Sequence, residues 1–259
     1  MTCRSRAGVH ELWDSEIEEL RLQIARPFGI PLRLHWSFWI LIVGVLGYTW
    51  SLVGVPALLP TSILLVGLVA SVVLHELGHA LAARRFDIDT HHITLYPFGG
   101  VAAIDHIPED PDQEIVIAFA GPAVNFVLAA VGGWLWLGTS HPLLMALVLM
   151  NLSMGVFNLI PAYPMDGGRI LRSLFARRMG WLPASRLAVK IGRGFAWSFL
   201  AVGVVMQSPS LLIMGIFLHV TLNAEHQRLV SLHWERTTGR PPPWEQSPGS
   251  PAHTTALSL

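Results

Sequence analysis

The chain has 259 residues, of which 52% are hydrophobic and only 13% are charged. An ordinary soluble domain carries roughly 25% charged residues, so this composition argues against a soluble, disordered or collagen-like chain and indicates an integral membrane protein. The 17 basic residues balance the 17 acidic ones, which leaves no net positive charge to attract nucleic acid. Its single cysteine, Cys3, excludes an intrachain disulfide and a cysteine-rich metal site.

The first 35 residues are predicted to form a cytosolic segment ahead of the membrane. They carry charges throughout and lack the apolar core of a cleavable signal peptide. Apolar residues recur at helical spacing between His10 and Ala25, which favours a short amphipathic helix lying on the membrane surface.

Four long apolar segments and two shorter ones follow, and each is predicted to be a transmembrane helix. About 20 helical residues cross a hydrocarbon core of about 30 Å, while the shorter segments are also compatible with re-entrant helices. The long segments are 36–55, 61–83, 115–137 and 142–160, and the shorter ones are 194–206 and 211–222. Two short strands, 91–96 and 101–104, are predicted around Gly99 and Gly100. We therefore expect an all-α integral membrane protein with about six transmembrane helices and a short re-entrant β-hairpin loop after the second span.

The basic residues predict the orientation in the cell membrane. With six spans, one side of the membrane holds all 17 basic residues, in segments 1–35, 84–114, 161–193 and 223–259. Because basic loops stay on the cytosolic side, both termini are expected there. Residues 36–225 are the predicted multi-pass domain, and residues 226–259 are a predicted cytosolic, disordered tail.

The second apolar segment contains the pattern H-E-x-x-H, formed by His75, Glu76 and His79. Histidines four positions apart lie on one face of a helix, so both imidazoles can bind one metal ion. Glu76 between them can serve as a general base toward water that the metal activates. Ionisable residues are costly inside a membrane span and therefore indicate function, although a hydrogen-bonded polar cluster joining helices is the alternative.

Asp166 is the leading candidate for a third ligand, since catalytic zinc usually takes three protein ligands. It follows the fourth apolar segment, where Pro161 and Pro164 break the helix and the glycine pair 167–168 permits tight turns. This end of the fourth segment lies at the same side of the membrane as His79. Three loop aspartates are rival ligands, although a solvated loop also explains them: Asp87, Asp89 and Asp105.

In these motifs the chain resembles the site-2 protease family of intramembrane zinc metalloproteases. The resemblance runs from about residue 27 to 225 and rests on H-E-L-G-H at 75–79, N-x-x-P-x-x-P-x-D-G-G at 158–168, A-G-P-x-x-N at 120–125, P-F-G-G at 97–100 and the opening at 29–37. It implies one zinc ion per chain, held by His75, His79 and Asp166, with Glu76 as the catalytic base. It also implies that Asn158 lies near the scissile carbonyl and that the loop of Gly99 and Gly100 dips toward the site.

The implied activity is zinc-dependent intramembrane proteolysis. The expected substrates are membrane proteins in the bilayer, cleaved in or near a transmembrane segment to release a cytosolic regulator. Two alternatives remain: a zinc-binding pseudoprotease or scaffold, against which the intact Glu76 argues, and a membrane-anchored zinc protease of cytosolic proteins. About 35 residues follow the sixth segment, too few for a CBS or PDZ domain, so regulation through such domains is not expected, and a homo-oligomer or a regulatory membrane partner is the alternative.

Overall fold

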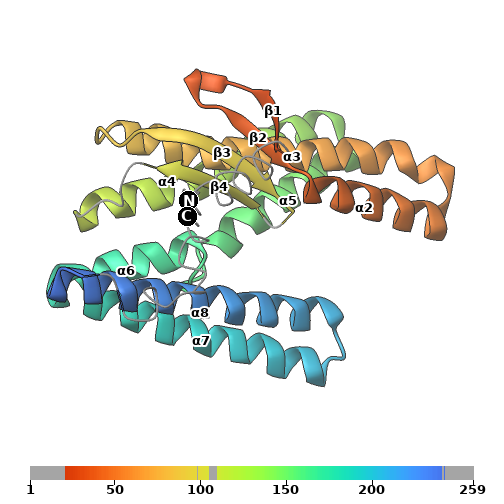
Figure 1. Cartoon of the computed structure of the whole chain (residues 1–259). Coiled ribbons are helices and arrows are strands. Elements are labelled where there is room, and N and C mark those ends of the chain that lie inside the picture. The colour runs from red at the N-terminus through yellow and green to blue at the C-terminus, as the bar shows by residue number, and fades with distance from the viewer. Residues whose placement is uncertain (1–20, 98, 105–109, 241, 243–259) are drawn as a thin grey trace, which may run out of the picture.

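The computed structural model describes residues 21–97, 99–104, 110–240 and 242. Most of this part of the chain is helical, and a four-stranded sheet lies among the helices (Figure 1). The helices are α2 (Ser37–Val53), α3 (Leu58–Arg84), α4 (Pro111–Thr139), α5 (Pro142–Asn158), α6 (Asp166–Met179), α7 (Trp181–Val205) and α8 (Pro209–Thr238). The strands are β1 (Arg21–Ala25), β2 (Leu32–His35), β3 (Thr90–Tyr96) and β4 (Gly99–Ile104), and two short 3-10 turns are η1 (Pro27–Gly29) and η2 (Val55–Ala57).

Each of the six predicted apolar segments forms a helix, and the chain is a membrane protein. Among the described residues, three helical stretches are long and apolar enough to cross a bilayer: Val55–Arg84, Pro111–Thr139 and Trp181–Val205. Helices α2 and α5 are apolar but have 17 residues each, or about 25 Å at 1.5 Å per residue. In α8 a charged second half follows the apolar segment. The number of six spans therefore remains a prediction.

Local sequence sets both ends of α4 and the start of α5. The Asp110 carboxylate accepts a hydrogen bond from the Asp112 backbone N–H at 2.8 Å and caps the start of α4. Helix α4 ends at Ser140, whose backbone is left-handed, and His141 then caps α5. So short a connection makes α4 and α5 antiparallel neighbours, which places side chains of α5 against the middle of α4.

The sheet is larger than the predicted hairpin. Strands β3 and β4 form the expected antiparallel pair around the glycine turn. Strand β2 pairs in parallel with β3, and β1 pairs antiparallel with β2, so the strand order is β1-β2-β3-β4. The predicted amphipathic helix is wrong over residues 21–25, which are strand β1, and its earlier residues lie outside the described chain. Leu22 and Ile24 alternate with polar neighbours, a strand pattern, yet both are exposed.

Two helical regions differ from the sequence-based expectation. Helix α6 occupies a segment that was expected to be a cytosolic loop. Helix α8 does not end near residue 225 but continues to Thr238. Helix α6 and the second half of α8 carry several charged side chains, so a search for apolar segments does not detect them as helices.

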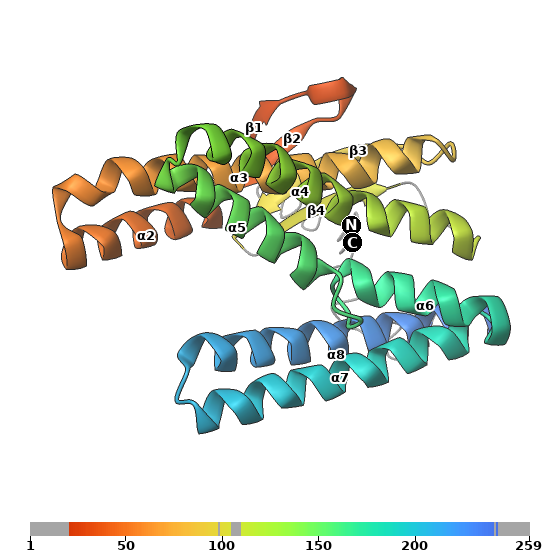
Figure 2. The same cartoon turned by 180° about the vertical axis from the view of Figure 1, so that it is seen from behind.

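The elements form two groups that α6 joins. Helices α2–α5 and the sheet lie on one side, and α7 and α8 lie beside each other on the other side (Figures 1 and 2). Helix α6 packs against both α4 and α7. One apolar core joins the sheet to α2 and α3, and a second joins α7 and α8 to the α5–α6 connection, including Tyr163. The metal-ligand candidates therefore lie where the two groups meet.

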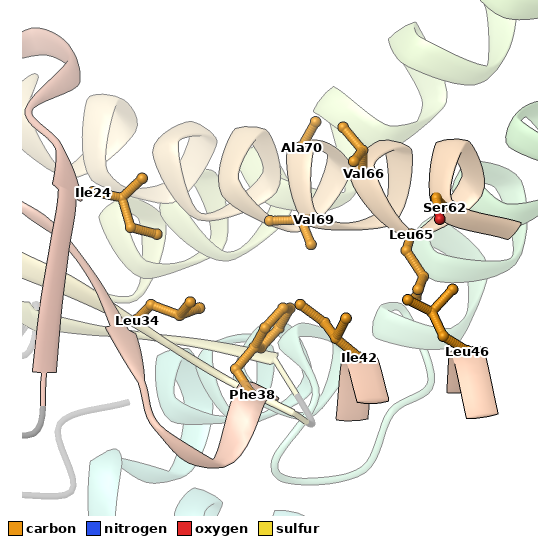
Figure 3. A pocket seen from close by; sticks show the side chains of 10 residues that line it. All are labelled: Ile24, Leu34, Phe38, Ile42, Leu46, Ser62, Leu65, Val66, Val69 and Ala70. Carbon is orange, nitrogen blue, oxygen red and sulfur yellow. The ribbon is translucent and has the colours of Figure 1, made fainter. Parts of the chain in front are cut away.

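An apolar cavity of about 400 Å³ lies between α2, α3 and the first two strands (Figure 3). Its lining side chains are apolar apart from Ser62. None of them can titrate or bind a metal, so this cavity offers no chemistry. The candidate site lies elsewhere, toward the C-terminal end of α3.

Candidate metal centre

Helices α3 and α6 bring three predicted ligands together. His75 and His79 lie one turn apart on α3, and Asp166 is the first residue of α6. All three side chains are buried. Among the described residues they form the one group of at least three potential metal-binding side chains, with their donor atoms within 4.8 Å of one another.

The three donor atoms form a nearly equilateral triangle. The Nε2 atoms of His75 and His79 are 3.1 Å apart, and Oδ2 of Asp166 lies 3.3 Å from the first and 3.2 Å from the second. Ligands at 2.0–2.1 Å in a tetrahedral site are separated by about 3.3 Å. The spacing therefore fits a tetrahedral metal ion with three protein ligands.

Helix α4 orients both imidazoles through their other ring nitrogens. Nδ1 of His75 lies 2.5 Å from Oδ1 of Asn125, and Nδ1 of His79 lies 2.7 Å from the backbone oxygen of Ile117. A backbone oxygen can only accept a hydrogen bond, so Nδ1 of His79 carries the proton and its Nε2 is free.

A chain of amide hydrogen bonds fixes His75 in the same way. The Leu147 backbone oxygen accepts from Nδ2 of Asn151, so Oδ1 of Asn151 faces Asn125 and accepts from its Nδ2 at 3.0 Å. Nδ2 of Asn125 also lies 3.2 Å from the sulfur of Met154. Oδ1 of Asn125 must therefore accept from His75, which leaves Nε2 of His75 unprotonated. Asn151 was not predicted to take part, and a polar residue inside an apolar segment was its only signal.

With both imidazoles neutral, their Nε2 atoms and Oδ2 of the Asp166 carboxylate face one another as three lone-pair-bearing atoms without a proton between them. Oδ2 of Asp166 is buried without a hydrogen-bond partner. Such an arrangement is unfavourable unless a cation lies among the three atoms. Two imidazoles and one carboxylate are a donor set that suits zinc.

The backbone of α4 approaches the imidazoles closely at Gly121. A Cβ atom at this position would collide with the His79 ring and would lie 2.7 Å from Nε2 of His75. Only glycine leaves room for both rings at this helix contact. The glycine of the A-G-P-x-x-N motif therefore acts by allowing α3 and α4 to come together.

Strand β4 lies against Glu76. A Cβ atom at Gly100 would lie 2.7 Å from Cδ of Glu76 and 2.9 Å from its Oε1. Gly99 pairs with Tyr96 at the hairpin turn, where its backbone has a φ of 144° that disfavours other residues. Gly100 thus lies beside the predicted base, the half-buried Glu76, and Gly99 is its neighbour at the turn.

The remaining predicted residues are less tightly placed. Asn158 is half-buried at the end of α5, and its Nδ2 donates to the Met154 backbone oxygen at 3.1 Å, within its own helix. Asp87 and Asp89 do not join the described group of metal-binding side chains, and Asp105 lies outside the described residues. Asp166 is therefore favoured over its rivals as third ligand.

A second polar cluster, which the sequence did not predict, joins α4 to α6. The Glu114 carboxylate accepts hydrogen bonds from Arg172 and, at 2.5 Å, from the Ser173 hydroxyl. Its Oε1 also lies 3.7 Å from Nε of Arg169. Burial lowers the pKa of Arg172 to about 10, so the guanidinium keeps its charge at neutral pH. We call these four residues the α4–α6 clasp.

Comparison with known proteins identifies the family. Residues 63–141 and 136–199 match the model of peptidase family M50. A zinc metalloprotease of Methanocaldococcus jannaschii is 36% identical over 210 residues, which cover 76% of this chain and 58% of the relative. The chain belongs to peptidase family M50. The resemblance to site-2 proteases is thereby confirmed, and zinc is the metal that these relatives and the donor set indicate.

A solved structure and a bacterial relative agree with this assignment. The solved structure of the site-2 protease from Methanocaldococcus jannaschii superposes with a TM-score of 0.61 at 34% identity, covering 79% of this chain and 94% of that one. Stage IV sporulation protein FB of Bacillus subtilis is 29% identical over 205 residues, which cover 76% of this chain and 70% of that protein. The chain spans less than two thirds of the length of the archaeal zinc metalloprotease, at 58%.

Proposed function

We propose that this M50 protein is a zinc-dependent endopeptidase that hydrolyses peptide bonds in or near the transmembrane segments of other membrane proteins. One observation carries the proposal: Glu76 lies on α3 between the two histidines of the three-donor cluster and beneath strand β4. In this proposal His75, His79 and Asp166 hold one zinc ion per chain. Zinc, when bound, supplies Lewis acidity that polarises a peptide carbonyl and makes water more acidic.

Glu76 is the proposed general base. It accepts a proton from the attacking water and then delivers that proton to the amine that leaves. The half-buried carboxylate lies against Gly100, so no side chain of this residue separates it from the edge of the sheet. Metal binding alone does not require a carboxylate at position 76, which favours a catalytic role over that of a zinc-binding scaffold.

Asn158 is the proposed donor to the developing oxyanion. One of its two amide hydrogens is used by the Met154 backbone oxygen, which leaves the second available for a ligand. Loss of a single oxyanion donor costs other hydrolases about 3 kcal/mol in kcat. The same magnitude is expected here.

Strand β4 is the proposed docking edge for substrate. A helical substrate has its carbonyls in hydrogen bonds and must unwind before hydrolysis. Among the described strands, β4 pairs only with β3, so its outer edge is available to an extended peptide. Gly99 and Gly100 would leave space for that peptide directly above Glu76.

The proposed topology is a multi-pass protein of six spans in the cell membrane, with both termini and the metal centre at the cytosolic side. All 17 basic residues lie on the side assigned to the cytosol. Cleavage there would release a cytosolic regulator from its membrane anchor, which is the proposed biological outcome.

The test is cleavage of a tagged single-span membrane peptide by the purified full chain in detergent, with bound zinc quantified for each variant. Glu76→Gln should retain zinc and lose cleavage by at least about 100-fold, as expected for removal of a general base. The matched control is Asp87→Asn, which alters a rival ligand at a turn with a positive φ that asparagine tolerates; it should keep both zinc and cleavage.

Two results would contradict the proposal. If Glu76→Gln cleaved as fast as the wild type, Glu76 would not be the base. If every variant bound zinc and none cleaved any peptide, a zinc-binding scaffold would account for the site better than an enzyme.

A further inference from the structure

The α4–α6 clasp is a charged cluster removed from water. Side chains of its central three members are almost completely inaccessible: 2% exposed for Glu114, 3% for Arg172 and 0% for Ser173. Burying a carboxylate and a guanidinium is costly even when they are paired. Apolar side chains could pack the two helices together without this cost in free energy. We therefore expect the charged cluster to have a further role.

Arg172 is itself fixed from several directions. Its guanidinium carbon lies 5.5 Å from the ring centre of Tyr163 and 5.2 Å from that of Trp181, both within cation–π range. Tyr163 belongs to the connection that leads into α6, and Trp181 begins α7. The guanidinium therefore joins Glu114 of α4 to the residues on both sides of α6.

Two members of the clasp, Arg169 and Ser173, lie on the same face of α6 as the proposed third zinc ligand. Asp166, Arg169 and Ser173 are spaced i, i+3 and i+7, which places them on one face of α6. The first turn of α6 has no side-chain cap at its preceding residue, Met165. The contacts from Glu114 to Arg169, Arg172 and Ser173 therefore hold α6 against α4 within two turns of Asp166.

Helix α4 also supplies the hydrogen-bond acceptors for both histidines, Asn125 and the Ile117 backbone oxygen. We propose that Glu114 is a positioning residue for zinc: through Arg172 and Ser173 it sets the Asp166 carboxylate against the two imidazoles that α4 already orients. This inference rests on the proposed function for the identity of the ligands. It predicts that weakening the clasp lowers zinc affinity although no clasp residue touches the metal.

The test measures zinc affinity by chelator competition on the full chain in detergent, together with the visible absorption spectrum of the cobalt(II)-substituted protein. Glu114→Gln should raise the zinc dissociation constant about tenfold, the lower end of what outer partners of metal ligands typically contribute. Its cobalt bands should shift, because Asp166 would meet the metal in an altered geometry. Ser173→Ala, which removes a single hydrogen bond, should have a smaller effect in the same direction.

The chain offers a matched control in the exposed ion pair of Asp112 and Arg177. It joins the same two helices, but its side chains are 70% and 48% exposed. Asp112→Asn should leave zinc affinity and the cobalt spectrum unchanged, since exposed pairs contribute little.

A double variant separates positioning from folding. Glu114→Gln alone removes the carboxylate that binds the buried Arg172 guanidinium and lowers thermal stability, whereas Glu114→Gln combined with Arg172→Met removes both charges. The proposal expects the double variant to regain thermal stability while its zinc affinity stays low. If affinity and spectrum returned to wild-type values together with stability, or if Glu114→Gln lost stability alone, the clasp would be purely structural and the proposal would be wrong.

Failure of the positioning role of Glu114 can be distinguished from failure of the proposed protease function. A wild type that binds zinc but cleaves no peptide would defeat the protease proposal and leave the affinity comparison intact. Should Glu114→Gln not fold, Ser173→Ala and the double variant decide between the two roles of the clasp.

Discussion

Both sides of the metal centre depend on α4, but His75 and His79 contact it through neutral hydrogen bonds, whereas the helix of Asp166 contacts it through a carboxylate and a guanidinium. The neutral partners, Asn125 and a backbone oxygen, lie within the apolar part of α4. The charged partner, Glu114, lies in its first turn.

The difference follows the surroundings of each contact. A charged partner at the middle of a membrane helix costs about 2.5–3.5 kcal/mol. Amide and carbonyl groups orient a histidine there without that cost in free energy. At the first turn of α4 the helix dipole favours a carboxylate, and the arginines of α6 can reach it. Neutral bonds set the protonated nitrogen of each imidazole, while charged bonds set the position of a whole helix.

The largest effect is expected from breaking the aspartate side at the ligand itself. Asp166→Ala leaves two imidazoles to hold zinc and should weaken zinc binding by more than about 100-fold, because loss of an outer partner alone typically costs 10–100-fold. Chelator competition on the purified protein measures this loss. Zinc binding at wild-type strength would show that Asp166 is not a ligand and that α6 does not help to hold the metal.

An intermediate effect is expected from removing Asn125, the hydrogen-bond partner of the proposed ligand His75. Asn125→Leu leaves the Nδ1 proton of His75 without an acceptor and should raise the zinc dissociation constant by about tenfold or more. Met154→Leu is the control, since it removes only the sulfur contact to Asn125 and keeps the acceptor. Equal affinities for the two variants would mean that the amide does not orient His75.

The smallest effect is expected at Asn151, which is two hydrogen bonds away from His75. Asn151→Leu removes the partner that fixes the Asn125 amide orientation, so zinc affinity should fall only about two- to fivefold, the value of one neutral hydrogen bond. Titration of Asn151→Leu and Asn125→Leu side by side tests the order. A larger loss for Asn151 than for Asn125 would contradict the chain of amides described above.

Much of the fold was readable because apolar segments and turn residues report local structure. The six predicted segments are helices, and the strands around Gly99 and Gly100 form their hairpin. Strand β1 was missed because its apolar residues also fit a helical period. Strand β2 pairs with β3 across more than 50 residues of sequence, and no local pattern encodes such a pairing.

The proximity of the proposed ligands, His75, His79 and Asp166, was predictable because their spacing is itself a geometric constraint. His75 and His79 share a helix face, and Asp166 follows a proline-broken helix end, so both signals are local. Glu114 and Arg172 are separated by 58 positions, and each alone resembles an ordinary charge at the end of a helix. Their partnership depends on how α6 packs, and α6 itself was expected to be a loop.

The parallel pairing of β2 with β3 also has a mechanical consequence. A displacement of β2 along its own axis strains its hydrogen bonds with β3 together, in shear, because Leu32, Arg33 and Leu34 are paired with residues 93–95. Strand β3 transmits that strain to β4 through their antiparallel pairs. A displacement of β2, which directly precedes the first membrane helix, is therefore coupled through backbone hydrogen bonds to Gly100, beside Glu76.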